Sequence, residues 1–427
     1  MYHYSVESYF FPLFIIGFAL IFLMRNSNKN APILIFLLIW FFTFLFHGVT
    51  TAFQLVDLYP SGLIPNLLVT GAVLTLSLSF IVFRSFFMKA LGSSNFELIN
   101  LLNTQISESF RKKNQLIFVF FSLVAFYFMF KQATQIIDGK NVFFALQLLR
   151  SNLNYEDYNW GMVRYLGVPV TVIAVYMMTS SKGQKLRSKI PAIIVFFCAL
   201  LIAVLSTQRT AILMLLVALL FSTSRSNFPK MRVIIFTAIV FVLFFTIVGF
   251  LVGKVGNNID NNYEIFLLGL ESFIKYFLSP LSAFSESGIW KNPSHDGGFS
   301  LRFFFSLLTS LGIYSGDVKE LVLDISLVPF PTNVYTFVFA SISDFGYFYF
   351  WYYLLIGFIL GFVFSLPRTR ISCRVLQGFS YYPLIMSVFQ DQFFAILSTW
   401  IQIIIMVIVL HFFLERNVLN LNLKKSS

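Results

Sequence analysis

Long apolar segments constrain this chain more than any other feature of its sequence. A membrane-spanning helix needs about 20 predominantly apolar residues. Eleven segments approach or reach this length: 8–24, 31–54, 62–83, 115–133, 161–180, 190–206, 208–223, 233–253, 345–365, 376–390 and 393–413. Two of them, 208–223 and 376–390, are short, so we expect about 10 to 14 spans. The sequence predicts an all-α polytopic integral membrane protein, because a helix forms its backbone hydrogen bonds within itself and needs no water in lipid.

Composition and charge agree with this prediction. Hydrophobic residues make up 58% of the chain and mean hydropathy is +0.82, more than a soluble core requires. Assigning alternate loops to opposite sides places 20 of the 30 basic residues on one side, with only three acidic residues. That side is expected to face the cytoplasm. The net charge of +12 then reflects topology, and no nucleic-acid partner is expected.

Signal-peptide and metal-site motifs are missing from the sequence. The segment MYHYSVESYFF has no basic region and no small-residue cleavage site, so the first apolar run is expected to remain as a helix. Cys198 and Cys373 fall at opposite ends of different predicted helices, which predicts neither a disulfide nor a metal site. The chain has no P-loop, GxGxxG, HExxH, CxxC or DxD pattern. No cofactor and no metal are therefore expected.

One outer segment, residues 254–344, holds nine of the eighteen carboxylates. It divides the chain into eight predicted helices in 1–253, a large outer loop, and three helices with a cytoplasmic tail in 345–427. The loop is expected to contain interfacial helices. Its stretch 299–314 is apolar but only 16 residues long, so an interfacial or re-entrant helix is favoured over a span.

The first part of this loop has the pattern of an amphipathic helix. Glu264, Glu271 and Lys275 fall on one line of a helix whose remaining surface is apolar. Such a helix is predicted to lie in the lipid headgroup layer. Pro280 is expected to end or kink it.

Four cations on the outer side are candidate phosphate ligands. Arg209, in STQRTAIL between two apolar runs, could bind phosphate through its planar fork or snorkel to lipid headgroups. Arg164 at the start of the fifth helix allows the same two interpretations. Arg302 lies in the interfacial segment, where a lipid-phosphate contact is plausible. Lys275 could instead pair with Glu271, four residues earlier.

Three residues are candidates for proton transfer. Asp344 could be the N-cap of the ninth helix or a general base where the loop meets the membrane. Glu286 is a competing base, and His295 is the single histidine of the outer loop; each could equally be only solvated. Asp391, in the turn between the last two predicted helices, is interpreted as structural.

Aromatic residues of the outer loop include Tyr276, Trp290 and Tyr335. They could stack on sugar rings. They could equally belong to the interfacial aromatic belt of a membrane protein, and composition does not separate the two.

Three stretches resemble a known family. They are STQRTAIL (206–213), KYFLSPLSAF (275–284) and PTNVYTFVFASISDFGYFYFWYYLLIGFILG (331–361). Together with the late large loop, they are similar to the O-antigen and related oligosaccharide repeat-unit polymerases of the Wzy type. Gln208 departs from the Gly or Ser commoner in the family. The odd number of predicted helices, which puts the N-terminus outside, also departs from its pattern.

The resemblance implies a metal-independent glycosyltransferase of surface-polysaccharide (lipopolysaccharide) biosynthesis in the bacterial inner membrane. It would transfer the growing glycan from undecaprenyl diphosphate to the non-reducing end of a new lipid-linked repeat unit at the periplasmic face. Its implied partners are that lipid-linked oligosaccharide, membrane lipids and a chain-length regulator protein. The implied residues are Arg209, Arg164, Arg302 and Lys275 for diphosphate, Asp344, Glu286 and His295 for catalysis, and Tyr276, Trp290, Asn333 and Tyr335 for sugar.

Two other functions stay open. A ligase-like enzyme of O-antigen transfer would use the same lipid donor. A flippase or transporter of lipid-linked sugars would place charges within its helices and have related halves. The charges of this chain lie almost wholly in loops, which favours an enzyme.

Overall fold

The computed structural model describes residues 7–25, 27–90, 108–139, 160–224, 262–320 and 323–416, together with Leu146, Leu148, Leu149, Asn152, Ile239 and Leu243. The described residues are almost entirely helical. Their only strands are β1 (Ser326–Leu327) and β2 (Pro331–Thr332), which pair antiparallel with Ser326 opposite Thr332. The prediction of an all-α polytopic membrane protein is confirmed.

The helices fall into three groups along the chain. The first group is α1 (Glu7–Met24), α2 (Ser27–Ala52), α3 (Leu63–Ala90), α5 (Glu108–Ile136), the 3-10 turn η1 (Gly161–Leu166), α7 (Gly167–Ser180), α8 (Leu186–Leu205) and α9 (Arg209–Thr223). The second is α11 (Asn262–Ser287), α12 (Arg302–Ser310), α13 (Val338–Phe345) and the 3-10 turn η2 (Gly346–Phe348). The third is α14 (Tyr349–Ser365), α15 (Ile371–Met386) and α16 (Leu397–His411), followed by a π-helical turn, Phe412–Arg416.

The observed helices match most of the predicted spans, and the differences lie in the second half of the chain. Eight helices of the described residues are long and apolar enough to cross a membrane, and α9 is a shorter apolar helix. The predicted span 233–253 lies outside the described residues, apart from Ile239 and Leu243. The last two predicted spans, 376–390 and 393–413, were placed too close together. An irregular turn with buried apolar residues separates α15 from α16, and hydropathy alone does not distinguish such a turn from a helix.

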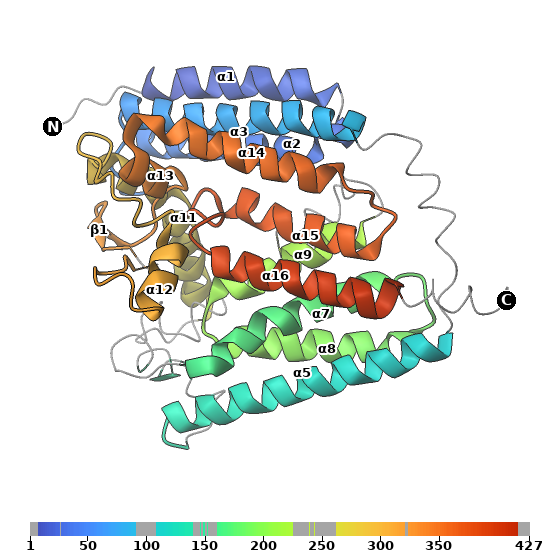
Figure 1. The fold of residues 1–427 in the computed structure, drawn as a ribbon. Helices are drawn as coiled ribbons and strands as arrows, with labels where there is room; N and C mark the ends of the chain where they lie inside the picture. The colour runs from blue at the N-terminus through green and yellow to red at the C-terminus, as the bar shows by residue number, and fades with distance from the viewer. Residues whose placement is uncertain are drawn as a thin grey trace.

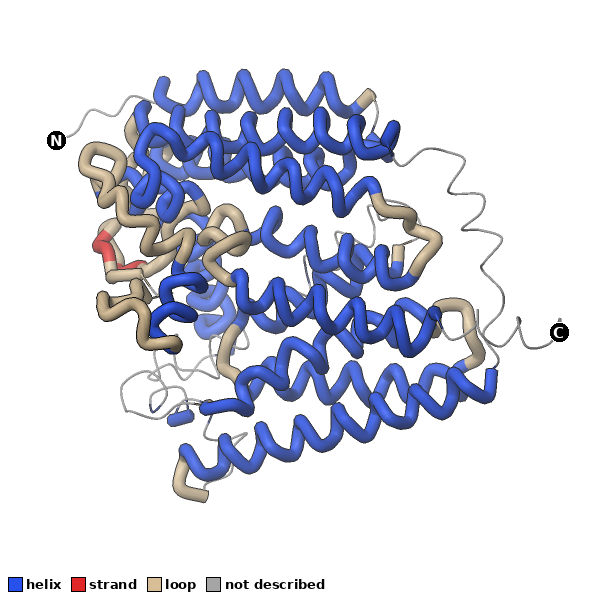
Figure 2. Tube along the Cα trace, viewed as in Figure 1, coloured by secondary structure: helices blue, strands red, loops and turns tan. Residues whose placement is uncertain are grey.

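The long helices run side by side, and the second group lies across one end of the bundle (Figure 1). We call this the loop end; it carries α11, α12, α13 and the strand pair, which is red in Figure 2. The start of α1 and the turn between α15 and α16 also lie there (Figure 1). The end of α16 lies at the opposite end of the bundle. This arrangement agrees with the predicted alternation of loops between two sides.

Small residues allow two helix pairs to approach closely. A Cβ atom on Gly357 of α14 would lie 2.5 Å from the Ser79 side chain of α3, and one on Gly361 would lie 2.9 Å from the Arg84 backbone nitrogen. Gly378 of α15 meets the Ala218 carbonyl of α9 in the same way, at 2.6 Å. Without a hydrophobic drive between helices in lipid, such close backbone packing stabilises their association.

The helix α11 corrects one prediction of the sequence. Pro280 does not end it, since α11 continues to Ser287. Its second half does not lie in the headgroup layer either, because residues 278–284 are all buried. The Ser282 hydroxyl donates to the Tyr59 carbonyl at 2.6 Å and lies 2.8 Å from His47 Nε2. The serines of this half find partners inside the protein, so α11 enters the core. The short helix α12, by contrast, has no buried residue, and its nine residues agree with the predicted non-spanning segment.

Candidate active site at the loop end

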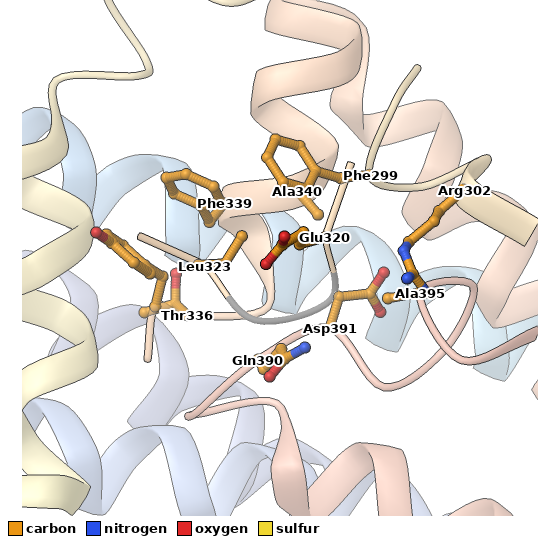
Figure 3. A pocket seen from close by; sticks show the side chains of 11 residues that line it. Phe299, Arg302, Glu320, Leu323, Thr336, Phe339, Ala340, Gln390, Asp391 and Ala395 are labelled. Atoms are coloured by element: carbon orange, nitrogen blue, oxygen red, sulfur yellow. The ribbon is translucent and has the colours of Figure 1, made fainter. Parts of the chain in front are cut away.

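A pocket opens at the loop end, between the second group of helices and the turn that joins α15 to α16 (Figure 3). The cavity has a volume of about 20 Å³, and its mouth is open to solvent. Its lining residues are Phe299, Arg302, Glu320, Leu323, Tyr335, Thr336, Phe339, Ala340, Gln390, Asp391 and Ala395. Small-molecule sites combine apolar walls with a few placed polar groups. This pocket has that character, with one cation and two carboxylates among aromatic side chains.

Arg302 supplies the cation. It is the first residue of α12, and its Nε donates to the Lys319 carbonyl at 2.5 Å. Its terminal Nη groups make no hydrogen bond to any described residue. Burial lowers the pKa of Arg302, the charge of Arg164 lowers it further, and Glu320 acts against both. An arginine nevertheless keeps its proton in proteins, so the pocket holds a fixed positive charge with free donors.

Asp391 supplies a buried carboxylate, 2% exposed, from the turn between α15 and α16. The Tyr352 hydroxyl of α14 donates to Oδ2, and the Phe393 backbone N–H donates to Oδ1 at 2.8 Å. Burial raises the pKa of Asp391 to about 6, against the opposing effect of these hydrogen bonds. The carboxyl group is therefore held in place and changes its charge close to neutral pH.

Asp344 does not have the N-cap role that was one of the two predicted for it. It is the next-to-last residue of α13, so it does not cap the ninth predicted helix; α14 begins at Tyr349 without a side-chain cap. Asp344 Oδ1 accepts the Phe299 backbone N–H at 3.2 Å and Oδ2 accepts that of Ser300 at 2.5 Å. Its carboxylate fixes the turn that leads into Arg302. The role of general base stays a prediction for Asp344, which is not among the residues that line the pocket.

His295 belongs to the same loop but lies outside the pocket lining. Its backbone N–H donates to the Ser343 carbonyl at 3.0 Å, and its side chain is exposed. A Cβ atom on Gly346 would lie 2.5 Å from His295 Cε1, and Gly346 has φ 54°. Both facts require glycine there. The motif Asp344–Phe345–Gly346 thus anchors a loop.

Two further arginines lie around this site. Arg164, in η1, is exposed, and its charge acts on Arg302. Arg209 begins α9; its side chain lies outside the described residues. Its neighbour Thr210 hydrogen-bonds the Tyr382 side chain, whose hydroxyl donates to Gln392 Oε1 at 3.1 Å. The start of α9 is thereby tied to the turn that carries Asp391.

Lys275 adopts the alternative predicted for it. Its ammonium pairs with Glu271 Oε1 at 2.6 Å and lies 5.4 Å from the centre of the Phe330 ring. Both partners of this ion pair are partly exposed. Glu286 is also exposed, at the end of α11, and neither residue lines the pocket.

Of the predicted sugar-binding residues, the pocket lining includes only Tyr335. Its hydroxyl donates to the Asp324 carbonyl at 3.0 Å, and its ring lines the cavity. Tyr276 stacks on Phe389 at 5.1 Å between ring centres. Trp290 is half-buried beneath Lys291, and Asn333 is exposed. Sugar contacts of all four residues stay a prediction.

Sequence reasoning gave no site role to three residues, namely Asp391, Glu320 and Tyr352. Asp391 was assigned a structural role because it stands in a short turn between two apolar segments. The available signal was that it is the one carboxylate between the last two predicted helices. Glu320 and Tyr352 carry no comparable signal, since only the fold brings them to the pocket.

Comparison with known proteins supports the resemblance seen in the sequence. The chain is 26% identical over 288 residues to an Escherichia coli (strain K12) protein named "Putative O-antigen polymerase". The matched region covers 65% of this chain and 68% of that protein. No protein-family model and no solved structure matches the chain. The chain is thus similar to a protein that is named as an O-antigen polymerase, in agreement with the resemblance predicted from the sequence.

Proposed function

We propose that the protein polymerises lipid-linked oligosaccharide repeat units, transferring the growing glycan from undecaprenyl diphosphate to a new lipid-linked unit. One observation carries the proposal. Arg302 is fixed through the Lys319 carbonyl and the turn that Asp344 anchors, and it presents free guanidinium donors to a pocket that also holds Asp391. The similarity to a protein named as an O-antigen polymerase supports the same conclusion.

The chemistry requires a fixed cation in that place. When the bond from the sugar C1 to the diphosphate breaks, negative charge collects on the departing phosphate oxygen. Preorganised donors aimed at this charge stabilise the transition state. The planar guanidinium of Arg302 suits phosphate, and Arg164 adds positive charge nearby. Arg209 is a further candidate phosphate ligand in this proposal. In this proposal the arginines perform the task without a metal ion.

The proposal places the loop end in the periplasm and the protein in the bacterial inner membrane. The opposite end of the bundle carries the basic connections, among them Lys182, Lys185, Arg368 and Arg370, as expected for a cytoplasmic side. A lipid-linked substrate would reach a pocket at the loop end from within the bilayer. A chain-length regulator protein belongs to the same proposal as a partner in the membrane.

Deleting the gene in the organism that encodes it, and restoring it on a plasmid, tests the proposal. The deletion strain should lose long surface polysaccharide and keep single repeat units, as seen on a silver-stained gel. Wild-type protein should restore the ladder of chain lengths. Long chains that accumulate on the lipid carrier in the deletion strain would instead identify a ligase. Unchanged chain lengths would refute both.

Substitution of Arg302 then tests the site. Arg302→Ala should lower the polymerisation rate by about 100-fold or more, the scale measured when one donor to a developing negative charge is removed. Arg302→Lys should retain part of the rate, since it keeps the charge but not the fork. Lys291→Ala, which removes an exposed cation outside the pocket lining, is the matched control and should leave chain lengths unchanged. Equal rates for Arg302→Ala and the control would remove Arg302 from the mechanism.

A further inference from the structure

The turn between α15 and α16 places one acidic side chain against the pocket with its partners already defined. We propose that Asp391 is the general base that takes the proton of the acceptor hydroxyl, and that Tyr352 is the residue that positions it. This inference rests on the proposed function and deepens it. It assigns a catalytic role to Asp391, in the turn, and a positioning role to Tyr352, on α14.

The hydrogen bonds of Asp391 leave room for one more partner. An ionised carboxylate has about four lone-pair positions. The backbone N–H groups of Phe393 and Ala395 and the Tyr352 hydroxyl occupy three of them. The carboxylate also lines the pocket, where Figure 3 shows it directed to the side on which Arg302 lies. A hydroxyl bound in the pocket can therefore donate to the remaining position.

Geometry favours Asp391 over the other acids of the loop end. Both Asp344 oxygens accept backbone N–H groups of the turn before α12, and Asp344 does not line the pocket. Glu320 does line the pocket but is exposed, and it faces Arg302, whose pKa it raises. Glu286 is exposed and lies outside the lining. Of the acidic side chains that the structure describes at the loop end, only that of Asp391 is buried, fixed by several hydrogen bonds and open to the cavity.

The proposed step balances as follows in atoms and charge. The acceptor O–H bond breaks and its proton moves to the Asp391 carboxylate. The acceptor oxygen forms a bond to the sugar C1, and the bond from C1 to the diphosphate oxygen breaks with its electron pair on that oxygen. Arg302 stabilises the resulting negative charge. Asp391 then releases its proton to water, which restores the carboxylate.

Burial supports this role, because it raises the pKa of Asp391 to about 6, near the value that suits a general base at neutral pH. The base works only when ionised, so the rate should fall as the pH drops below this value. The charged and titratable groups that face Asp391 from the elements around it are Tyr352, Tyr353, Asp344, Arg302 and Glu320. Arg302 keeps its charge through this range.

The experiment measures elongation by purified enzyme, using the single lipid-linked repeat units that a deletion strain accumulates. Asp391→Asn should lower the rate by about 100-fold or more, and Asp391→Glu should retain part of it. Removing the Tyr352 hydroxyl takes away a hydrogen bond that lowers the pKa of Asp391. Tyr352→Phe should therefore move the acid limb of the pH–rate profile upward by about one to two pH units.

Tyr353→Phe is the matched control. Tyr353 is also a fully buried tyrosine of α14, but its hydroxyl bonds Ser341 and the Phe337 carbonyl. It should leave the acid limb in place. A rate for Asp391→Asn within about threefold of wild type, or a Tyr352→Phe profile that matches wild type, would overturn the assignment. Should Asp391→Asn fail to fold, the Tyr352→Phe profile still decides.

Failure of this inference is distinguishable from failure of the proposed function. If the wild-type enzyme does not join the repeat units, the polymerase proposal fails. If it joins them and Asp391→Asn does so equally well, only the assignment of the base fails.

Discussion

At the scale of single residues, the loop end depends on backbone groups held by a few side chains. Asp344 binds two consecutive N–H groups, and Gly346 makes room for His295. Neither residue lines the pocket, yet both fix the loop from which Arg302 begins α12. The position of the cation is thus set by residues outside the pocket lining.

Asp344→Ala should therefore impair the enzyme through structure. Leaving two N–H groups without their acceptor should cost about 2 to 4 kcal/mol of unfolding free energy. Thermal unfolding of purified protein in detergent measures this loss. Elongation should also weaken, because Arg302 loses its support.

The pH–rate profile separates this role from that of a base. The remaining activity of Asp344→Asn should keep the wild-type acid limb, since the proposed base is Asp391. A loss of the acid limb in Asp344→Asn would make Asp344 the base and contradict the positioning role.

At the scale of elements, contact between α3 and α14 brings Tyr352 to its place. The Ser79 hydroxyl donates to the Leu354 carbonyl at 2.7 Å, across the point where Gly357 meets α3. Such an approach needs a residue without a Cβ atom. Tyr352 lies on α14, five residues before Gly357. The contact between α3 and α14 therefore also affects the position of the Tyr352 hydroxyl, which donates to Asp391.

Gly357→Ala should destabilise the protein by about 1 to 3 kcal/mol, because the added methyl group would overlap Ser79 and the helices would have to separate. Thermal unfolding in detergent again provides the measurement. Gly167→Ala on α7 is the control: its Cβ atom would meet Ile202 at an ordinary 3.5 Å. Equal unfolding temperatures for the two variants would show that the close approach of α3 and α14 at Gly357 does not contribute to the stability of the protein.

At the scale of the whole molecule, the two ends of the bundle differ in character. The loop end holds the pocket and the acidic residues around it, and the opposite end holds basic connections. The positive-inside rule therefore predicts that the loop end faces away from the cytoplasm. The orientation that we propose for the site rests on this asymmetry.

Cysteine labelling checks that orientation. In a protein without Cys198 and Cys373, Asn333→Cys should react with a membrane-impermeant maleimide in intact spheroplasts. Thr369→Cys, exposed at the other end, should react only after lysis. The reverse pattern would place the pocket in the cytoplasm and contradict the proposed use of a periplasmic substrate.

Much of this fold could be predicted from the sequence, because an apolar segment that is long enough to cross a lipid bilayer has to form a helix there. The short helix around 302–310 followed from the same reasoning. The buried second half of α11 could not be predicted: its helical pattern resembles that of a surface helix, and only contacts with Tyr59 and His47 place it inside.

The site was predictable only in part. Arg302 and Tyr335 were identified as candidates and line the pocket, while Lys275 pairs with Glu271 as its local spacing allows. Asp391 was identified but given a structural role. Its chemical character comes from burial and from Tyr352, which lies 39 residues away in the chain.

The sequence by itself determined a helical membrane protein, the side on which its charges lie and the family it resembles, because these depend on composition and order along the chain. The tertiary structure alone decided which acidic residues line the pocket, which one anchors a backbone turn and which cation keeps donors that bond no described residue. Those roles depend on hydrogen bonds and burial between distant segments, and a linear pattern of residue types does not contain them.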